Sequence, residues 1–281
     1  MQMIKRLLLL LVIFCMCIIT IINADVGPKP SLEVTVMNAP NSLYYLDLLI
    51  DYSDDHLYQF IEENEIENKD MYNTLKSYNI DGWHPALVTG TKVPLNGKLT
   101  GIKEGEYTKH YFSYVGVPDK FKIIIVDSDN EIIVSENVLE RKSFNTKVYF
   151  DCDTRLIKEK SYILSTFMQL LPTCLLTLLI EGIILVFFGF SLKLNWKPFL
   201  IINIITQVLL TAIVGISMYA YGIMLALLAF FAFEWVIVIG EAILFSKYLK
   251  QHSKKRRVFY AITANIASML AGLMIALYIN L

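Results

Sequence analysis

The residues best placed to do chemistry are three glutamates within long apolar stretches. Glu181, Glu234 and Glu241 are the only acidic residues after Glu159. A charge at the centre of a membrane-spanning helix costs about 2.5 to 3.5 kcal/mol on insertion scales, so we expect these side chains to face other helices rather than lipid. Carboxyl groups in that setting can hold a proton or a cation, which would make them functional residues.

Amide side chains accompany the glutamates in the neighbouring apolar stretches. Asn203 and Gln207 are four residues apart and share one face of a helix, and Glu234 and Glu241 do the same at a spacing of seven. Asn265 lies in the last apolar stretch. We therefore predict one intramembrane polar cluster with these members: Glu181, Asn203, Gln207, Glu234, Glu241 and Asn265.

The cluster has more than one interpretation. It could form a proton-responsive or cation-responsive site or a small polar cavity for a substrate, or it could only hold the helices together by hydrogen bonds. Catalysis by Glu181 and Glu234 as acid and base is less favoured, because no nucleophile, metal-ligand set or histidine accompanies them. The chain also lacks the HExxH, GxSxG and GxxxxGK motifs. We expect no enzyme activity, no catalytic residue, no metal site and no cofactor.

Four apolar segments must position these side chains, at residues 162–190, 198–220, 221–245 and 259–280. Each exceeds the roughly 20 residues that cross a bilayer as a helix. Lipid cannot satisfy exposed backbone groups, so helices are the expected structure. Residues 161–281 are therefore predicted to form a four-helix transmembrane domain.

The N-terminus has the pattern of an export signal. Lys5 and Arg6 precede an apolar run at residues 7–22, which ends near the small residue Ala24. We predict a signal peptide at residues 1–24 with cleavage before Asp25, and an uncleaved anchor is the alternative. In either case the chain after Asp25 would be exported.

Residues 25–160 have a different sequence pattern, with short runs rich in Val, Ile, Tyr and Phe that are typical of strands. The polar residues 127–130 between two of these runs predict a hairpin turn. Residues 56–78 have helical spacing instead. The predicted fold class is thus a mixed membrane protein, with a β-rich, sandwich-like extracytoplasmic domain and a four-helix bundle. The predicted strands are residues 32–37, 43–50, 111–117, 121–126, 132–135 and 147–151.

The distribution of charged residues supports an extracytoplasmic position for residues 25–160. Residues 25–160 carry 23 acidic and 15 basic residues, whereas residues 161–281 carry 3 acidic and 8 basic ones. The basic residues fall in the loops at residues 191–197 and 246–258, and lysine and arginine are retained on the cytoplasmic side. We predict a multi-pass protein of the cell membrane, with residues 25–160 and the C-terminus outside. A lipid bilayer is the expected partner, and nucleic acid is not, because no basic patch lies elsewhere.

The chain resembles a group of Firmicutes membrane proteins of clostridial type that have no assigned activity. The resemblance rests on the start Asp25-Val-Gly-Pro-Lys-Pro-Ser, on Phe121-Lys-Ile-Ile-Ile-Val and on Leu178-Leu-Ile-Glu-Gly. Asn203-Ile-Ile-Thr-Gln and Ala264-Asn-Ile-Ala-Ser add to it. It implies a location in a Gram-positive cell envelope and assigns a role to no residue.

Two functional hypotheses follow. The leading one is a non-enzymatic envelope protein whose acidic outer domain binds an extracellular ligand, an ion or an envelope protein, with the helices as an anchor. The alternative is a small transporter or channel, or a subunit of one, in which the polar cluster lines the path. A transporter needs a wet cavity at the glutamates, whereas an anchor needs only packing.

Overall fold

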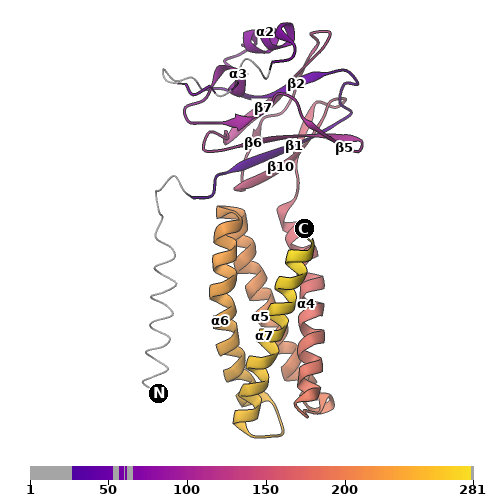
Figure 1. The fold of residues 1–281 in the computed structure, drawn as a ribbon, viewed down its shortest axis with the longest axis vertical. Coiled ribbons are helices and arrows are strands. Elements are labelled where there is room, and N and C mark those ends of the chain that lie inside the picture. The colour runs from indigo at the N-terminus through magenta and orange to yellow at the C-terminus, as the bar shows by residue number, and fades with distance from the viewer. Residues whose placement is uncertain (1–26, 53–56, 60, 62–65, 280–281) are drawn as a thin grey trace. The chain divides into compact units, whose positions relative to one another are not determined.

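The computed structural model of the protein describes residues 27–52, 57–59, 61 and 66–279 (Figure 1). They form two compact units. The first, from Pro28 to Ser161, is called the outer unit after its predicted location, and the helical unit begins at Tyr162. All the described strands belong to the first unit, and four long helices belong to the second. The predicted signal peptide, residues 1–24, lies outside the described residues.

One sheet of the first unit, sheet A, is built around β1 (Ser31–Met37). β1 pairs in parallel with β10 (Asn145–Asp151) and antiparallel with β6 (Tyr107–Ser113). Burial alternates along β10, because successive side chains point to opposite faces of a strand. Sheet A therefore has one buried and one exposed face. Its other strands are β4 (Asn96–Gly97), β5 (Ile102–Glu104) and β11 (Leu156–Glu159).

The second sheet, sheet B, is covered on both faces around its central strand. β2 (Tyr44–Ile50) pairs antiparallel with β7 (Lys120–Asp127), and every residue of β2 is buried. On one face lie the helices α2 (Lys69–Ser77) and α3 (Ala86–Thr89), which contact β2. This double coverage explains why β2 is a continuous apolar run rather than an alternating one. The remaining strands are β3 (His84–Pro85), β8 (Ile132–Val134) and β9 (Leu139–Glu140).

The other face of sheet B shares one apolar core with sheet A. Val34 and Phe150 of sheet A and Leu46, Leu48 and Ile123 of sheet B belong to the same buried cluster. The unit thus has three layers: the two short helices, sheet B and sheet A. The prediction of a β-rich, sandwich-like domain is confirmed.

Two turns show where the strand predictions succeed and fail. The hairpin between β7 and β8 is confirmed, with Asp127 Oδ1 accepting hydrogen bonds from the backbone N–H groups of Asp129 and Glu131 at 3.0 and 2.9 Å. The strand predicted at residues 111–117 is wrong in its second half, because β6 ends at Ser113. At Gly116 the chain passes so close to Val93 that a Cβ would lie 2.2 Å from the Val93 oxygen. No alternation pattern reveals such a contact.

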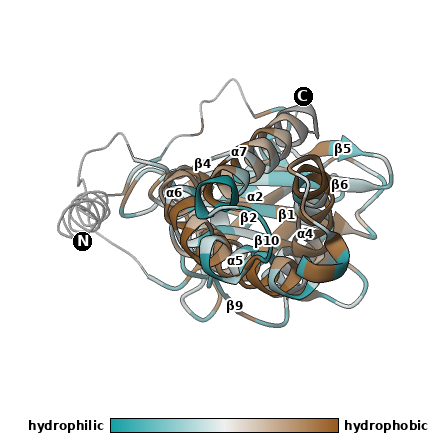
Figure 2. Cartoon of the chain, turned by 90° about the horizontal axis from the view of Figure 1, so that it is seen from below, coloured by the Kyte–Doolittle hydropathy of each residue, from teal (hydrophilic) through white to brown (hydrophobic). Residues whose placement is uncertain are grey.

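The second unit consists of four helices that are long and apolar enough to cross a membrane. The ribbons of these helices are coloured predominantly as hydrophobic in Figure 2. Gly222, with φ of 81°, separates the second helix from the third, a conformation that glycine adopts without strain. The helices are α4 (Tyr162–Phe187), α5 (Leu192–Tyr221), α6 (Ile223–Tyr248) and α7 (Lys254–Ile279).

The four helices form a closed ring. α4 packs against α5, α5 against α6, α6 against α7, and α7 against α4. Each helix therefore turns one side toward the centre of the bundle and the opposite side outward. The predicted four-helix bundle is confirmed, and its architecture is that of a multi-pass membrane protein.

Candidate binding cavity in the helical unit

Glu241 of α6 is the best-satisfied carboxyl group of the helical unit. It is 1 % exposed, and its Oε1 accepts a hydrogen bond from Thr206 Oγ1 at 2.6 Å. Its Oε2 accepts one from Asn265 Nδ2 at 2.7 Å. These bonds join α6 to α5 and α7. Glu241 and Asn265 of the predicted cluster are therefore direct partners.

Glu181 of α4 is equally buried but only partly satisfied. Its Oε1 accepts a hydrogen bond from Ser268 Oγ at 3.0 Å, and Ser268 lies three residues after Asn265 on α7. Its Oε2 has no hydrogen-bond partner among the described residues. A buried polar atom without a partner loses the solvation that water would give it, so this oxygen is an open acceptor.

Asn203 of α5 lies beside Glu181 and carries a second open acceptor. Its Nδ2 donates to the Phe199 carbonyl oxygen at 3.0 Å, a bond within its own helix. Its Oδ1 is buried without a partner in the described part of the chain. The Asn203 side chain is close enough to Glu181 to interact with its carboxyl group. Two adjacent acceptors can be satisfied by a proton on the Glu181 carboxyl group, by an added hydrogen-bond donor or by a cation.

Gln207 and Glu234 lie apart from this pair. Gln207 Nε2 is 3.5 Å from Thr173 Oγ1, the limit of a hydrogen bond, and Glu234 is half-buried on α6. Both nevertheless line the same cavity as Glu181 and Glu241. The cavity thus collects five of the six predicted residues, and Asn203 is the one outside its lining.

The cavity has a volume of about 400 Å³ and is lined by all four helices. Its lining extends from Tyr162 and Ile223, at the first residues of α4 and α6, to Glu181 and Glu241 deep within the same helices. Most of the wall is apolar or made of threonine, and the described lining residues include no lysine, arginine or histidine. Among the described lining residues, the three glutamates are therefore the acidic groups, and no basic group faces them.

Beyond the glutamates the bundle is closed by an apolar cluster. Tyr260 of α7 is fully buried there, and its ring centroid lies 5.9, 5.7 and 5.5 Å from those of Phe188, Phe190 and Phe245. Leu185 and Phe199 complete the packing from α4 and α5. The cavity therefore has an apolar floor immediately below its charged groups.

Sequence reasoning missed the hydroxyl groups of the site. Thr206 and Ser268 donate to the two buried glutamates, and Thr166, Thr173 and Thr177 line the cavity wall on α4. Their spacing along α4, together with Glu181, follows one helix face and could have indicated it. Threonine and serine are common in membrane helices, however, so their presence alone is a weak signal.

A third fully buried carboxyl group, also missed, lies in the outer unit. Asp47 of β2 is 0 % exposed and accepts hydrogen bonds from the backbone N–H groups of Leu48, Leu87 and Val88 at 2.6 to 3.1 Å. It caps the amino end of α3 and thereby attaches α3 to sheet B. Burial raises its pKa to about 7, against the opposing effect of these hydrogen bonds.

No three potential metal-ligating groups gather anywhere in the described residues.

No protein-family model, curated protein or solved structure matches this chain. The function must therefore be argued from the geometry of the cavity.

Proposed function

We propose that the helical unit binds a small organic cation, an amine with an apolar body, and that the protein is a small cation transporter or a subunit of one. The observation that carries this proposal is the cavity of about 400 Å³ that contains three carboxyl groups and no basic residue among its described lining. Ionisable residues that face an internal cavity of a membrane bundle commonly mark a pathway for a charged substrate.

The size and lining of the cavity support this ligand class. Pockets for small molecules occupy roughly 300 to 1,000 Å³ and are mostly apolar, with a few polar groups that fix orientation. The cavity is larger than a bare metal ion requires, and its apolar and threonine wall suits a hydrocarbon body. The carboxyl groups at its deep end suit a positively charged head, and the open Glu181 Oε2 can accept a hydrogen bond from an ammonium group.

The floor of the cavity favours transport over simple binding. A transporter opens its site alternately to the two sides of the membrane, so it needs a closure at one side in each state. The aromatic cluster around Tyr260 supplies such a closure at the end of the bundle that carries the basic loops. With these loops in the cytoplasm, the cavity of this state would open toward the outside.

Water accessibility of the cavity tests the proposal. In a cysteine-free full-length chain, single cysteines would replace Thr211, which lines the cavity, or Leu209, which is 54 % exposed on the outer surface of the same helix. We expect a membrane-impermeant cationic thiol reagent added outside to label Thr211→Cys and to spare Leu209→Cys. A cationic amine in excess should slow the labelling.

The opposite result has a clear meaning. If Thr211→Cys is protected from both sides, the bundle is dry, and the transport proposal fails. The polar cluster would then serve helix packing.

A second candidate function, ligand or partner binding by the outer unit, is favoured by the exposed face of sheet A. Tyr107, Tyr111 and Tyr149 are 47, 45 and 38 % exposed and lie on this face, which Ile102 extends. Tyrosine is enriched at binding surfaces because it buries a large apolar ring and keeps a polar tip. Replacing the three tyrosines by serine would abolish partner binding under this hypothesis and leave labelling of the cavity unchanged.

A further inference from the structure

We propose that the end of the helical unit at which α4 ends and α7 begins carries a site for an anionic phospholipid, whose phosphate binds Arg256 and whose acyl chains lie against phenylalanines of α4 and α7. The site is separate from the cation cavity and does not depend on its function. A pocket of about 540 Å³ marks it. The pocket is lined by Phe187, Phe188, Ser253, Lys255, Arg256 and Phe259.

Two consecutive arginines at the start of α7 have different roles. Arg257 donates hydrogen bonds to the carbonyl oxygens of Gln251, Ser246 and His252 at 2.9, 3.1 and 3.2 Å, so its guanidinium group holds the loop. The guanidinium group of Arg256 makes no hydrogen bond or ion pair with the described residues. The backbone N–H of Arg256 donates to Ser253 Oγ at 3.4 Å. Arg256 is thus available to a ligand.

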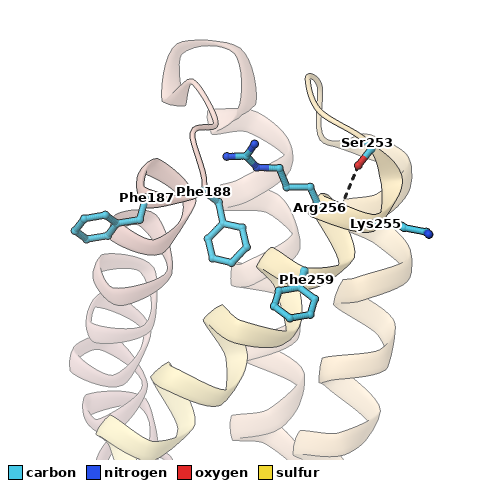
Figure 3. A pocket seen from close by; sticks show the side chains of 6 residues that line it. All are labelled: Phe187, Phe188, Ser253, Lys255, Arg256 and Phe259. Carbon is cyan, nitrogen blue, oxygen red and sulfur yellow. Dashed lines mark hydrogen bonds between the residues drawn. The ribbon is translucent and has the colours of Figure 1, made fainter.

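The position of Arg256 suits a phosphate at a membrane surface. Figure 3 shows its side chain extending toward the end of α4, above Phe188, whereas Lys255 points away from that group. Gly189 leaves room there, since a Cβ would lie 3.2 Å from Arg256 Nη2. A guanidinium group binds phosphate through two parallel hydrogen bonds.

The surrounding side chains indicate a lipid rather than a soluble anion. Phe187 and Phe259 are 82 and 69 % exposed at the edge of the pocket, on helices long enough to span a bilayer. A free phosphate would gain nothing from these rings, whereas acyl chains would cover them. Residues 191–197 and 246–258, at this end of the helical unit, include eight basic residues and no acidic one, which complements an anionic headgroup.

Native mass spectrometry of the full-length protein in detergent would test the site. The probes are phosphatidylglycerol and phosphatidylcholine with identical acyl chains. We expect the wild type to retain phosphatidylglycerol preferentially, and Arg256→Gln to retain about five-fold less of it. Lys254→Gln is the matched control, because it removes the same charge two residues away and Lys254 does not line the pocket. Its retention should equal that of the wild type.

Three outcomes would overturn the proposal. Equal losses in Arg256→Gln and Lys254→Gln would mean a general charge effect, and full retention in Arg256→Gln would exclude the arginine. Displacement of the lipid by an equal concentration of inorganic phosphate would show that the acyl chains contribute nothing. Conversely, Phe259→Ala should lower phosphatidylglycerol retention while keeping every basic residue.

Discussion

Asp47 in the outer unit and Glu181 in the helical unit are both almost completely buried, yet they differ in the number of hydrogen bonds that they accept. Asp47 accepts hydrogen bonds from three backbone N–H groups, whereas one Glu181 oxygen has a single donor and the other has none among the described residues. A satisfied carboxyl group is part of the structure, because it compensates for its own burial. A carboxyl oxygen without a partner beside a cavity can instead accept a hydrogen bond from a bound ligand.

Asp47 should show the largest effect on stability. Asp47→Ala leaves the N–H groups of Leu87 and Val88 without their acceptor, and we expect it to lower the free energy of unfolding by about 3 kcal/mol. Asp47→Asn keeps one acceptor oxygen and should lose less. Urea unfolding followed by Trp83 fluorescence, with Trp196 and Trp235 replaced by phenylalanine, reports on the outer unit. Equal stability of Asp47→Ala and the wild type would contradict a structural role.

Glu181 should show its effect in binding instead. Glu181→Gln removes the ionisable group at the deep end of the cavity, and we expect amine binding to weaken about 100-fold while the fold is kept. Isothermal titration of the full-length protein in nanodiscs measures this. Glu33→Gln is the control, because it makes the same change on the exposed face of sheet A. Unchanged affinity in Glu181→Gln would remove the distinction between the two carboxyl groups.

The outer unit should also respond to pH through His110. This side chain is 1 % exposed, with its Nε2 3.2 Å from Tyr44 Oη, and burial lowers its pKa to about 4. The folded state thus binds the proton less tightly than the unfolded state, whose pKa is about 6.5. The stabilising contribution of neutral His110 is complete above pH 6.5 and declines as the pH falls toward 4, by about 2 kcal/mol at pH 5.

Asp47 acts in the opposite sense over this range, because its raised pKa makes stability increase as the pH falls from 7 toward 4. The useful measurement is therefore the difference in urea midpoint between the wild type and His110→Phe at each pH. We expect the difference to change between pH 7 and pH 5 in favour of the variant. A difference that is constant with pH would contradict the depressed pKa.

Asn203 offers the smallest but most discriminating test. Asn203→Leu removes a buried open acceptor, so it should stabilise the helical unit if the polar cluster serves packing alone. If Asn203 and Glu181 together bind a cation, we expect affinity for the amine to fall about ten-fold. Thermal stability and amine affinity measured on the same sample separate these cases. Greater stability with undiminished affinity would favour the packing interpretation.

The sequence by itself determined the two-part architecture. Apolar segments of more than 20 residues permit only helices in lipid, and alternating runs between polar turns favour strands. It also singled out the polar cluster, because an acidic residue in such a segment must face inward. These conclusions depend on local composition and periodicity, which the chain carries in every conformation.

The tertiary structure alone decided which polar groups are satisfied. The partners of Glu241 come from two other helices, at Thr206 and Asn265. Two of the three donors to Asp47 come from a helix about 40 residues away in sequence. The difference between Arg256, whose guanidinium group is unbonded, and Arg257, whose guanidinium group is bonded, likewise depends on where the backbone carbonyl oxygens lie. Hydrogen bonds form between atoms about 3 Å apart, and no one-dimensional pattern encodes that distance between remote segments.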